Sequence, residues 1–217
     1  MSKEVVKDMT LHEFDMQYYG TAPLLCGTDE AGRGPLAGDV FAAAVILSPD
    51  TVIEGLNDSK KLTEKKRDKL FDEIKEKALY WSIERATVEE IERLNILNSA
   101  MLAMKRAVEA LGVVPDLVLA DGNKLPPVDC PVQYVVKGDA KSASIAAASI
   151  LAKVARDRYM LEMAEKYPQY AFEKHKGYGT KLHYEKLDEF GACEIHRQSF
   201  LKKYYAQKKA DDDKQQA

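Results

Sequence analysis

The order of strand-like and helix-like segments constrains the fold of this chain more than any other feature. Apolar and β-branched runs predict strands at 24–29, 39–47, 80–87, 116–121 and 132–139. Helical spacing of apolar residues predicts helices at 63–78, 88–111 and 142–166. A glycine-rich turn joins the first two strands, which favours an antiparallel hairpin, whereas strands separated by helices usually lie parallel. The sequence therefore predicts an α/β domain with a mixed sheet.

The length and the ends of the chain predict its domain organisation. With 217 residues, the chain has the size of one domain rather than two. A shorter helix through Phe190 and a last helical segment are expected to complete a domain at 1–205, followed by a disordered polar tail at 206–217. No stretch approaches the ~18 apolar residues of a membrane span, and the first residues do not resemble a secretory signal. We therefore expect a cytoplasmic monomer with no membrane partner.

Acidic residues end three of the predicted strands: Asp29 with Glu30, Asp121, and Asp139. Because ligand sites gather at the carboxyl ends of strands in α/β sheets, these four acids could converge. Converging carboxylates repel one another unless a cation or retained protons neutralise them. Oxygen ligands suit Mg²⁺ or Mn²⁺, and a pair of such ions supports phosphodiester hydrolysis. The alternative is that these acids form turns and helix caps, as Asp121 could before Gly122.

Other metal chemistry is not indicated. The three cysteines and four histidines lack the spacing of a zinc site or a disulfide framework, so a metal would be held by oxygen. Asp29 and Glu30 are adjacent, and adjacent residues of a regular strand point to opposite faces, so both side chains could not reach one site. Either the strand breaks at Glu30, or Glu30 reaches the metal through its backbone carbonyl or through water.

The glycines after the first acids form a second candidate feature. Gly32-Arg33-Gly34-Pro35 predicts a tight turn whose exposed backbone could approach a sugar or a phosphate, although a plain hairpin loop has the same composition. The net charge of −3 argues against non-specific attraction of nucleic acid by the whole molecule. Contacts would come from the basic stretches 60–69 and 174–186, which alone would also be typical of solvated faces.

Several motifs together resemble a known family. DEAGRGPLAG (29–38), NDSKKLT (57–63), ADGN (120–123), KGDAKSASIAAASILAKVARD (137–157) and HKGYGT (175–180) occur in this order. This chain is similar over most of 24–200 to ribonuclease HII, the type 2 ribonuclease H family, and its short interval between Asp121 and Asp139 resembles the bacterial members. The GRG and GYGT motifs differ from those of the related ribonuclease HIII.

The resemblance implies a fold, a metal site and a substrate-binding surface. The fold would be a ribonuclease H-like mixed sheet flanked by helices, with a C-terminal helical extension. Asp29, Glu30, Asp121 and Asp139 would be the catalytic acids and would hold two Mn²⁺ or Mg²⁺ ions. Gly32, Arg33 and Gly34 would contact the ribose 2′-hydroxyl, and Tyr178 would pack on the sugar of the next deoxynucleotide. Lys60 and Lys61 would contact phosphates, and Lys153 and Arg156 could line the same channel.

The implied activity is metal-dependent hydrolysis of the RNA strand of RNA–DNA hybrids. The enzyme would also nick duplex DNA on the 5′ side of an embedded ribonucleotide, leaving 3′-hydroxyl and 5′-phosphate ends. The residues alone leave two rivals open, a metal-dependent DNA nuclease and a non-catalytic nucleic-acid-binding module. The acids disfavour a binding module, because uncompensated carboxylates repel the phosphates of a nucleic acid.

The C-terminal QSFLKKYY (198–205) resembles a peptide that binds sliding clamps, with Gln198, Leu201, Tyr204 and Tyr205 at the spacing of that motif. Such peptides belong to archaeal and eukaryotic clamps, whereas the chain resembles bacterial ribonucleases. We therefore favour the alternative interpretation, a terminal helix with a basic end.

Overall fold

The sheet places the predicted strands in one mixed layer. The computed structural model describes residues 9–57, 59 and 62–215. The strand order is β3-β2-β1-β4-β5, with β1 antiparallel to β2 and parallel to β4. β3 is antiparallel to β2, and β5 is parallel to β4. The strands are β1 (Leu25–Ala31), β2 (Val40–Ile46), β3 (Tyr80–Ala86), β4 (Leu117–Asp121) and β5 (Val132–Val135). The prediction of a mixed sheet is confirmed.

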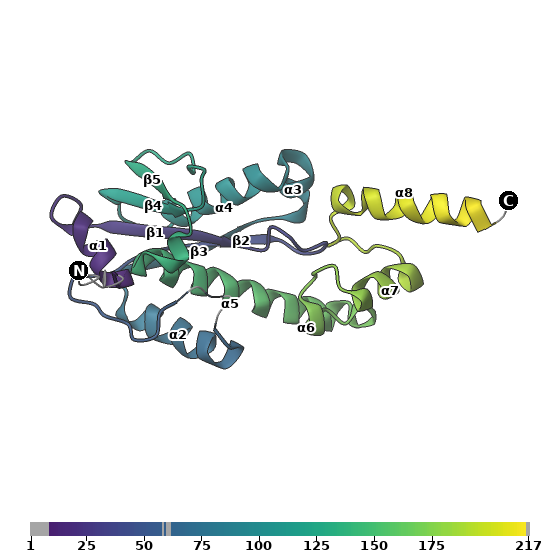
Figure 1. The fold of residues 1–217 in the computed structure, drawn as a ribbon, viewed down its shortest axis with the longest axis horizontal. Coiled ribbons are helices and arrows are strands. Elements are labelled where there is room, and N and C mark those ends of the chain that lie inside the picture. The colour runs from purple at the N-terminus through teal and green to yellow at the C-terminus, as the bar shows by residue number, and fades with distance from the viewer. Residues whose placement is uncertain (1–8, 58, 60–61, 216–217) are drawn as a thin grey trace, which may run out of the picture.

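Helices cover both faces of this sheet (Figure 1). One core cluster joins the sheet to α2 (Glu64–Lys77) and α5 (Ala143–Lys166), and a second joins it to α3 (Val88–Leu94) and α4 (Ile96–Glu109). Every residue of β2 is buried, as expected for a strand packed on both faces. The remaining helices are α1 (Leu11–Tyr19), α6 (Phe172–His175), α7 (Lys181–Phe190) and α8 (Gln198–Gln215), with 3₁₀ turns at Gly138–Ala140 and Pro168–Tyr170.

The first turns of α5 lie directly against β1, and small residues make this approach possible. A Cβ on Gly27 would fall 2.1 Å from the backbone carbon of Ser144. Ser142 caps the helix by accepting a hydrogen bond from the amide of Ile145. The buried Asp15 of α1 accepts two hydrogen bonds of 2.8 Å from Ser144, one from the amide and one from the hydroxyl. These contacts fix the start of the helix that carries Ser149 and Lys153.

Three predicted elements differ from the structure by more than a shift of one or two residues at an end. The helix expected at 88–111 is two helices, because Asn95 has a φ of 67° and interrupts the helical backbone. The strand expected at 132–139 ends at Val135, so Asp139 lies in a 3₁₀ turn rather than at a strand end. The tail expected at 206–217 is helical as far as Gln215, because α8 continues into it.

α8 forms the C-terminal helical extension and runs away from the sheet (Figure 1). No helix in the described ranges combines the length and the apolar character needed to cross a membrane.

Candidate active site

Asp29 and Glu30 lie near the end of β1, beside the next parallel strand. The strand does not break at Glu30 but continues to Ala31. Both acids nevertheless line the same cavity of about 220 Å³. Asp29 is buried, and Arg33 donates a hydrogen bond of 3.1 Å from Nη1 to Oε1 of Glu30. The long glutamate side chain is thus held toward the turn that follows the strand, and a strand break is not needed to bring both residues to the cavity.

Asp121 ends β4 and also lines this cavity. Its Oδ1 accepts a hydrogen bond of 2.6 Å from the amide of Gly138 and a longer one of 3.4 Å from the amide of Asp139. The buried Asp139 therefore has its backbone next to the carboxylate of Asp121, although it does not itself line the cavity. The four predicted acids come from β1, β4 and the 3₁₀ turn before α5.

The electrostatics of the acids suit a bound cation. Burial, and then the charges of Glu30 and Asp121, raise the pKa of Asp29 well above its usual range. Burial also raises the pKa of Glu30, against the opposing effect of Arg33. A divalent cation would offset this repulsion, and an all-oxygen donor set fits Mg²⁺ or Mn²⁺. Within the described part of the chain, no group of three or more acidic, histidine or cysteine side chains stands close enough together to hold an ion.

The glycine turn and Tyr178 also line this cavity. Gly32 has a φ of 105°, and a Cβ there would lie 2.2 Å from Nε of Arg156. A Cβ on Gly34 would only touch Cε1 of Tyr178, at 3.9 Å. The amide of Leu36 donates to the carbonyl of Gly177 at 2.8 Å, so the turn and the Tyr178 loop are joined. Tyr178 is 42% exposed, and it is therefore available to a ligand.

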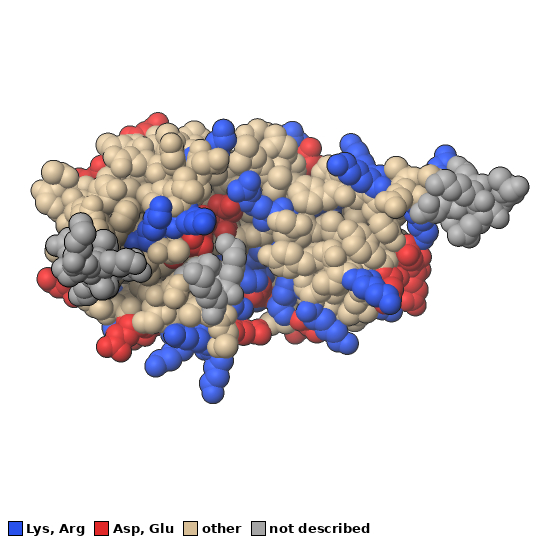
Figure 2. Space-filling model, viewed as in Figure 1, with Lys and Arg blue, Asp and Glu red and all other residues tan. Residues whose placement is uncertain are grey.

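The predicted basic residues have different positions. Lys153 lines the cavity and pairs with Asp157 at 2.6 Å. Arg156 is fully buried and donates to the carbonyls of Ala37, Asp39 and Lys176, so it does not line a channel as the sequence suggested. Lys60 and Lys61 lie outside the described residues. Figure 2 shows acidic side chains within a hollow near the middle of the face, with lysine and arginine around it.

Three further residues at the site were not predicted. Ser59 and Ser149 line the cavity, and their hydroxyl oxygens are 3.0 Å apart. Ser149 also lowers the pKa of Asp29 through a hydrogen bond. The spacing of Ser149, Lys153 and Arg156 along one helical face was the available signal for this serine. Arg197 lies fully buried behind the glycine turn, and no pattern in the sequence indicated it.

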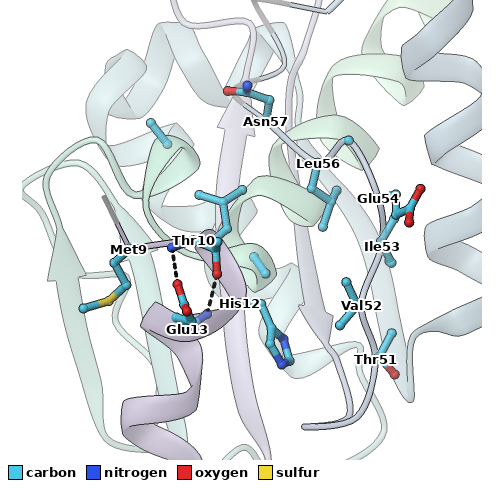
Figure 3. A pocket seen from close by; sticks show the side chains of 14 residues that line it. Met9, Thr10, His12, Glu13, Thr51, Val52, Ile53, Glu54, Leu56 and Asn57 are labelled. Carbon is cyan, nitrogen blue, oxygen red and sulfur yellow. Dashed lines mark hydrogen bonds between the residues drawn. The ribbon is translucent and has the colours of Figure 1, made fainter. Parts of the chain in front are cut away.

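A larger cavity of about 660 Å³ lies elsewhere, between the start of α1 and residues 51–57 (Figure 3). Its wall includes the capping box of α1, in which Thr10 and Glu13 exchange hydrogen bonds. None of the predicted site residues lines it. The chemistry expected from the acids therefore belongs to the smaller cavity.

The clamp-like segment is partly built into the domain. Leu201 is fully buried and packs in a cluster with Leu36 and Leu187. The Tyr204 hydroxyl donates to Asp188 at 2.6 Å. Leu201 is thus not available as an exposed docking residue while α8 stays packed.

A mixed sheet in this strand order, with acids near the ends of the adjacent parallel strands β1 and β4, is typical of the class of ribonuclease H-like hydrolases. The sequence model of the family "Ribonuclease HII" matches residues 26–203. The chain belongs to the ribonuclease HII family, and it is an endoribonuclease of the ribonuclease H type. Enzymes of this family act on RNA–DNA hybrids and use divalent metal ions.

Similar proteins cover most of the chain. A ribonuclease HII from the bacterium Idiomarina loihiensis is 63% identical over 177 residues, which are 82% of this chain and 95% of that protein. The solved ribonuclease H2 of Pyrococcus horikoshii is 26% identical, with a TM-score of 0.67, over 81% of this chain and 92% of that one. Ribonuclease HII of Archaeoglobus fulgidus, solved as a complex with PCNA, is 25% identical, with a TM-score of 0.68, over 80% of this chain and 93% of that one.

Proposed function

We propose that this enzyme nicks duplex DNA on the 5′ side of an embedded ribonucleotide, in addition to cutting the RNA strand of hybrids. The observation that carries the proposal is the composition of one cavity: three acids share about 220 Å³ with the glycine turn and the Tyr178 loop. A hydrolytic site formed by these acids would lie directly beside a close-approaching backbone and an exposed aromatic side chain. Such a pair can sense a 2′-hydroxyl on one nucleotide and its absence on the next.

The acids are proposed as the metal-binding and catalytic residues. Asp29, Glu30 and Asp121 would hold two Mg²⁺ or Mn²⁺ ions, with Asp139 joining them from the 3₁₀ turn beside Asp121. When bound, the ions would supply an activated water and stabilise the leaving oxygen. The raised pKa values of Asp29 and Glu30 support this role, because these carboxyls need a neutralising partner to ionise.

The chain's other residues are proposed to orient the substrate. The Gly32-Arg33-Gly34 turn would approach the ribose, and Tyr178 would pack against the neighbouring deoxyribose. Lys153 lines the cavity and would contact a phosphate, as would Lys60 and Lys61 from outside the described residues. In-line attack of water on the phosphorus would leave 3′-hydroxyl and 5′-phosphate ends.

The sliding clamp is not part of this proposal. The Archaeoglobus fulgidus relative was solved with PCNA, but in this chain Leu201 of the clamp-like segment is buried in the domain. We propose that the segment serves as a terminal helix.

The deciding experiment compares a duplex bearing one ribonucleotide with its all-DNA twin, with divalent metal and with EDTA. We expect Mg²⁺- or Mn²⁺-dependent cleavage of the first duplex only. Asp121→Asn should lower kcat roughly a thousandfold, equivalent to about 4 kcal/mol of barrier, while duplex affinity and melting temperature stay near the wild type. The amide oxygen of the asparagine can still accept from Gly138, so the local fold should survive.

Asp129→Asn is the matched control, because Asp129 is an exposed acid outside the cavity and its loss should leave kcat unchanged. Equal cleavage of both duplexes would instead indicate a DNA nuclease. Binding without cleavage in either metal would indicate a binding module. Undiminished turnover by Asp121→Asn would refute the assignment of the acids.

A further inference from the structure

Arg197 is a buried arginine, and all its side-chain N–H groups donate to backbone carbonyls within residues 32–38. It is fully buried, and it precedes α8 in the sequence. Its Nη2 donates at 2.7 Å to the carbonyl of Gly32 and at 2.7 Å to that of Gly38. Nη1 donates to the carbonyls of Arg33 and Pro35, at 3.1 and 2.9 Å, and Nε donates to Gly38 at 2.9 Å. All five guanidinium N–H groups are thus used.

The direction of these carbonyls fixes the direction of the neighbouring amides. The described residues contain no cis peptide bond, and in a trans peptide the carbonyl and the following N–H point to opposite sides. Because the carbonyls of Gly32 and Arg33 point at Arg197, the N–H groups of Arg33 and Gly34 point away from it. Neither amide donates a hydrogen bond to another described residue. Arg33 and Gly34 also line the acidic cavity.

The same arginine connects the turn to the Tyr178 loop. Its hold on the carbonyl of Pro35 directs the next amide, that of Leu36, toward the carbonyl of Gly177, which accepts at 2.8 Å. The backbone of Arg197 adds a 2.8 Å hydrogen bond from its own amide to the carbonyl of Leu36. One residue thereby sets the orientation of the turn and supports its junction with the Tyr178 loop, and both segments are proposed to meet the sugar.

Stability alone is a poor reason for an arginine here. Burying a guanidinium group is costly, and the similarly buried Arg156 lies close enough to oppose the charge of Arg197. The hydrogen bonds from the buried guanidinium group to the backbone carbonyls do, however, hold the turn in one defined conformation. Preorganised donors bind a partner without first losing conformational entropy.

We propose that Arg197 is a positioning residue for ribose recognition, which holds the Gly32-Arg33-Gly34 turn with its free N–H groups facing the substrate. This role rests on the proposed function, because it assumes that the turn senses the 2′-hydroxyl. Arg197 does not touch the substrate. Its loss should therefore weaken the discrimination between ribose and deoxyribose rather than general affinity for a duplex.

The test measures binding in the Asp121→Asn background, where cleavage does not interfere. Two proteins are compared, the Asp121→Asn variant and the double variant that also carries Arg197→Gln. For each protein, dissociation constants are measured for the duplex with one ribonucleotide and for its all-DNA twin. We expect Arg197→Gln to weaken binding of the ribonucleotide duplex about tenfold, as for one or two lost hydrogen bonds, while affinity for the twin changes less than about twofold. Arg197→Lys is the second variant: it keeps the charge but has only three donors, and it should lose part of the preference.

Arg106→Lys is the control for a general loss of stability. Arg106 pairs with Glu90 through two hydrogen bonds, and it lies outside the cavity. The Arg106→Lys substitution should lower the melting temperature without changing the ratio of the two dissociation constants. Arg197→Gln and Arg197→Lys are compared at a temperature where circular dichroism shows each to be folded.

The outcomes separate the two proposals. Equal binding of both duplexes with Arg197 intact would overturn the role of Arg197, because there would be no binding preference for it to support. The proposed function fails separately, if the wild-type enzyme cleaves both duplexes equally. A preference that exists with Arg197 and persists in Arg197→Gln would overturn the role of Arg197 alone. Equal weakening of both duplexes would show that Arg197 supports only the general fold.

Discussion

Two independent constraints require glycine at position 32, the start of the Gly32-Arg33-Gly34 turn. Its φ of 105° is unfavourable for a residue with a Cβ, and the space that a Cβ would take is filled by the side chain of Arg156. Gly34, two residues later, has neither constraint, since a Cβ there would make only an ordinary contact with Tyr178. The two glycines of the motif are therefore physically different, although they look equivalent in the sequence.

This difference predicts unequal effects of alanine. Gly32→Ala should lower the free energy of unfolding by about 2–4 kcal/mol, from backbone strain and displacement of Arg156, whereas Gly34→Ala should change it by less than about 1 kcal/mol. Urea denaturation of both variants measures the difference. Equal losses in the two variants would show that the turn is not held as tightly as the contacts of Gly32 indicate.

The positions of Asp29 and Asp121 near strand ends were predictable from the sequence, but the burial of two arginines was not. Asp29 and Asp121 each follow an apolar run, so their place near a strand end follows from the pattern itself. Arg156 and Arg197 become buried because backbone carbonyls distant in sequence surround them. Hydrophobic periodicity carries no information on such partners. An arginine in a helical segment looks the same whether it faces solvent or a turn.

At the scale of elements, Asn95 shows why a continuous apolar pattern need not be a continuous helix. The apolar spacing of residues 88–111 suits one helix, yet the backbone turns at Asn95, whose side chain caps α4 by accepting from the amide of Asn98 at 3.1 Å. The steps of three and four residues continue across the break, because both helices pack on the same core cluster. The positive φ that separates them leaves no trace in hydrophobicity.

Two substitutions at Asn95 should therefore act in different directions. Asn95→Ala should destabilise the protein by about 1 kcal/mol, because it removes the cap and leaves the strained backbone. Asn95→Gly also removes the cap but relieves the strain, and it should be at least as stable as the wild type. Denaturant midpoints compare the two. If glycine costs as much as alanine, the conformation of Asn95 contributes no strain.

At the scale of the whole molecule, a chain of buried histidines connects the C-terminal segment to the Tyr178 loop. The Cys193 amide donates to Nδ1 of His196 at 3.0 Å, and Nε2 of His196 is 3.0 Å from Nε2 of His183. Nδ1 of His183 is 2.9 Å from the carbonyl of Tyr178, which can only accept. His183 therefore carries its proton on Nδ1, and His196 donates from Nε2. The chain holds together only while both rings are neutral.

Protonation of either ring would place two N–H donors face to face, so the protein should lose stability in acid. Burial lowers the pKa of His183 and of His196 to about 4, from an ordinary value of 6.5. The unfolded chain then binds more protons than the folded one between pH 6.5 and 4, and the free energy of unfolding should fall as the pH drops through this window. One such histidine accounts for about 3 kcal/mol across the window, and none of it is lost above pH 7.

Thermal denaturation from pH 8 to pH 4 measures this loss, and the comparison with His183→Gln isolates its source. The pKa values of Asp29 and Glu30 are raised in the folded protein, so these two carboxyls increase the free energy of unfolding as the pH falls. The contribution of the histidines is therefore measured as the difference in stability between His183→Gln and the wild type. His183→Gln should flatten the decline below pH 6.5, and His12→Gln, on α1 and outside the chain of histidines, should not. A decline that is as steep in His183→Gln as in the wild type would place the acid sensitivity elsewhere in the fold.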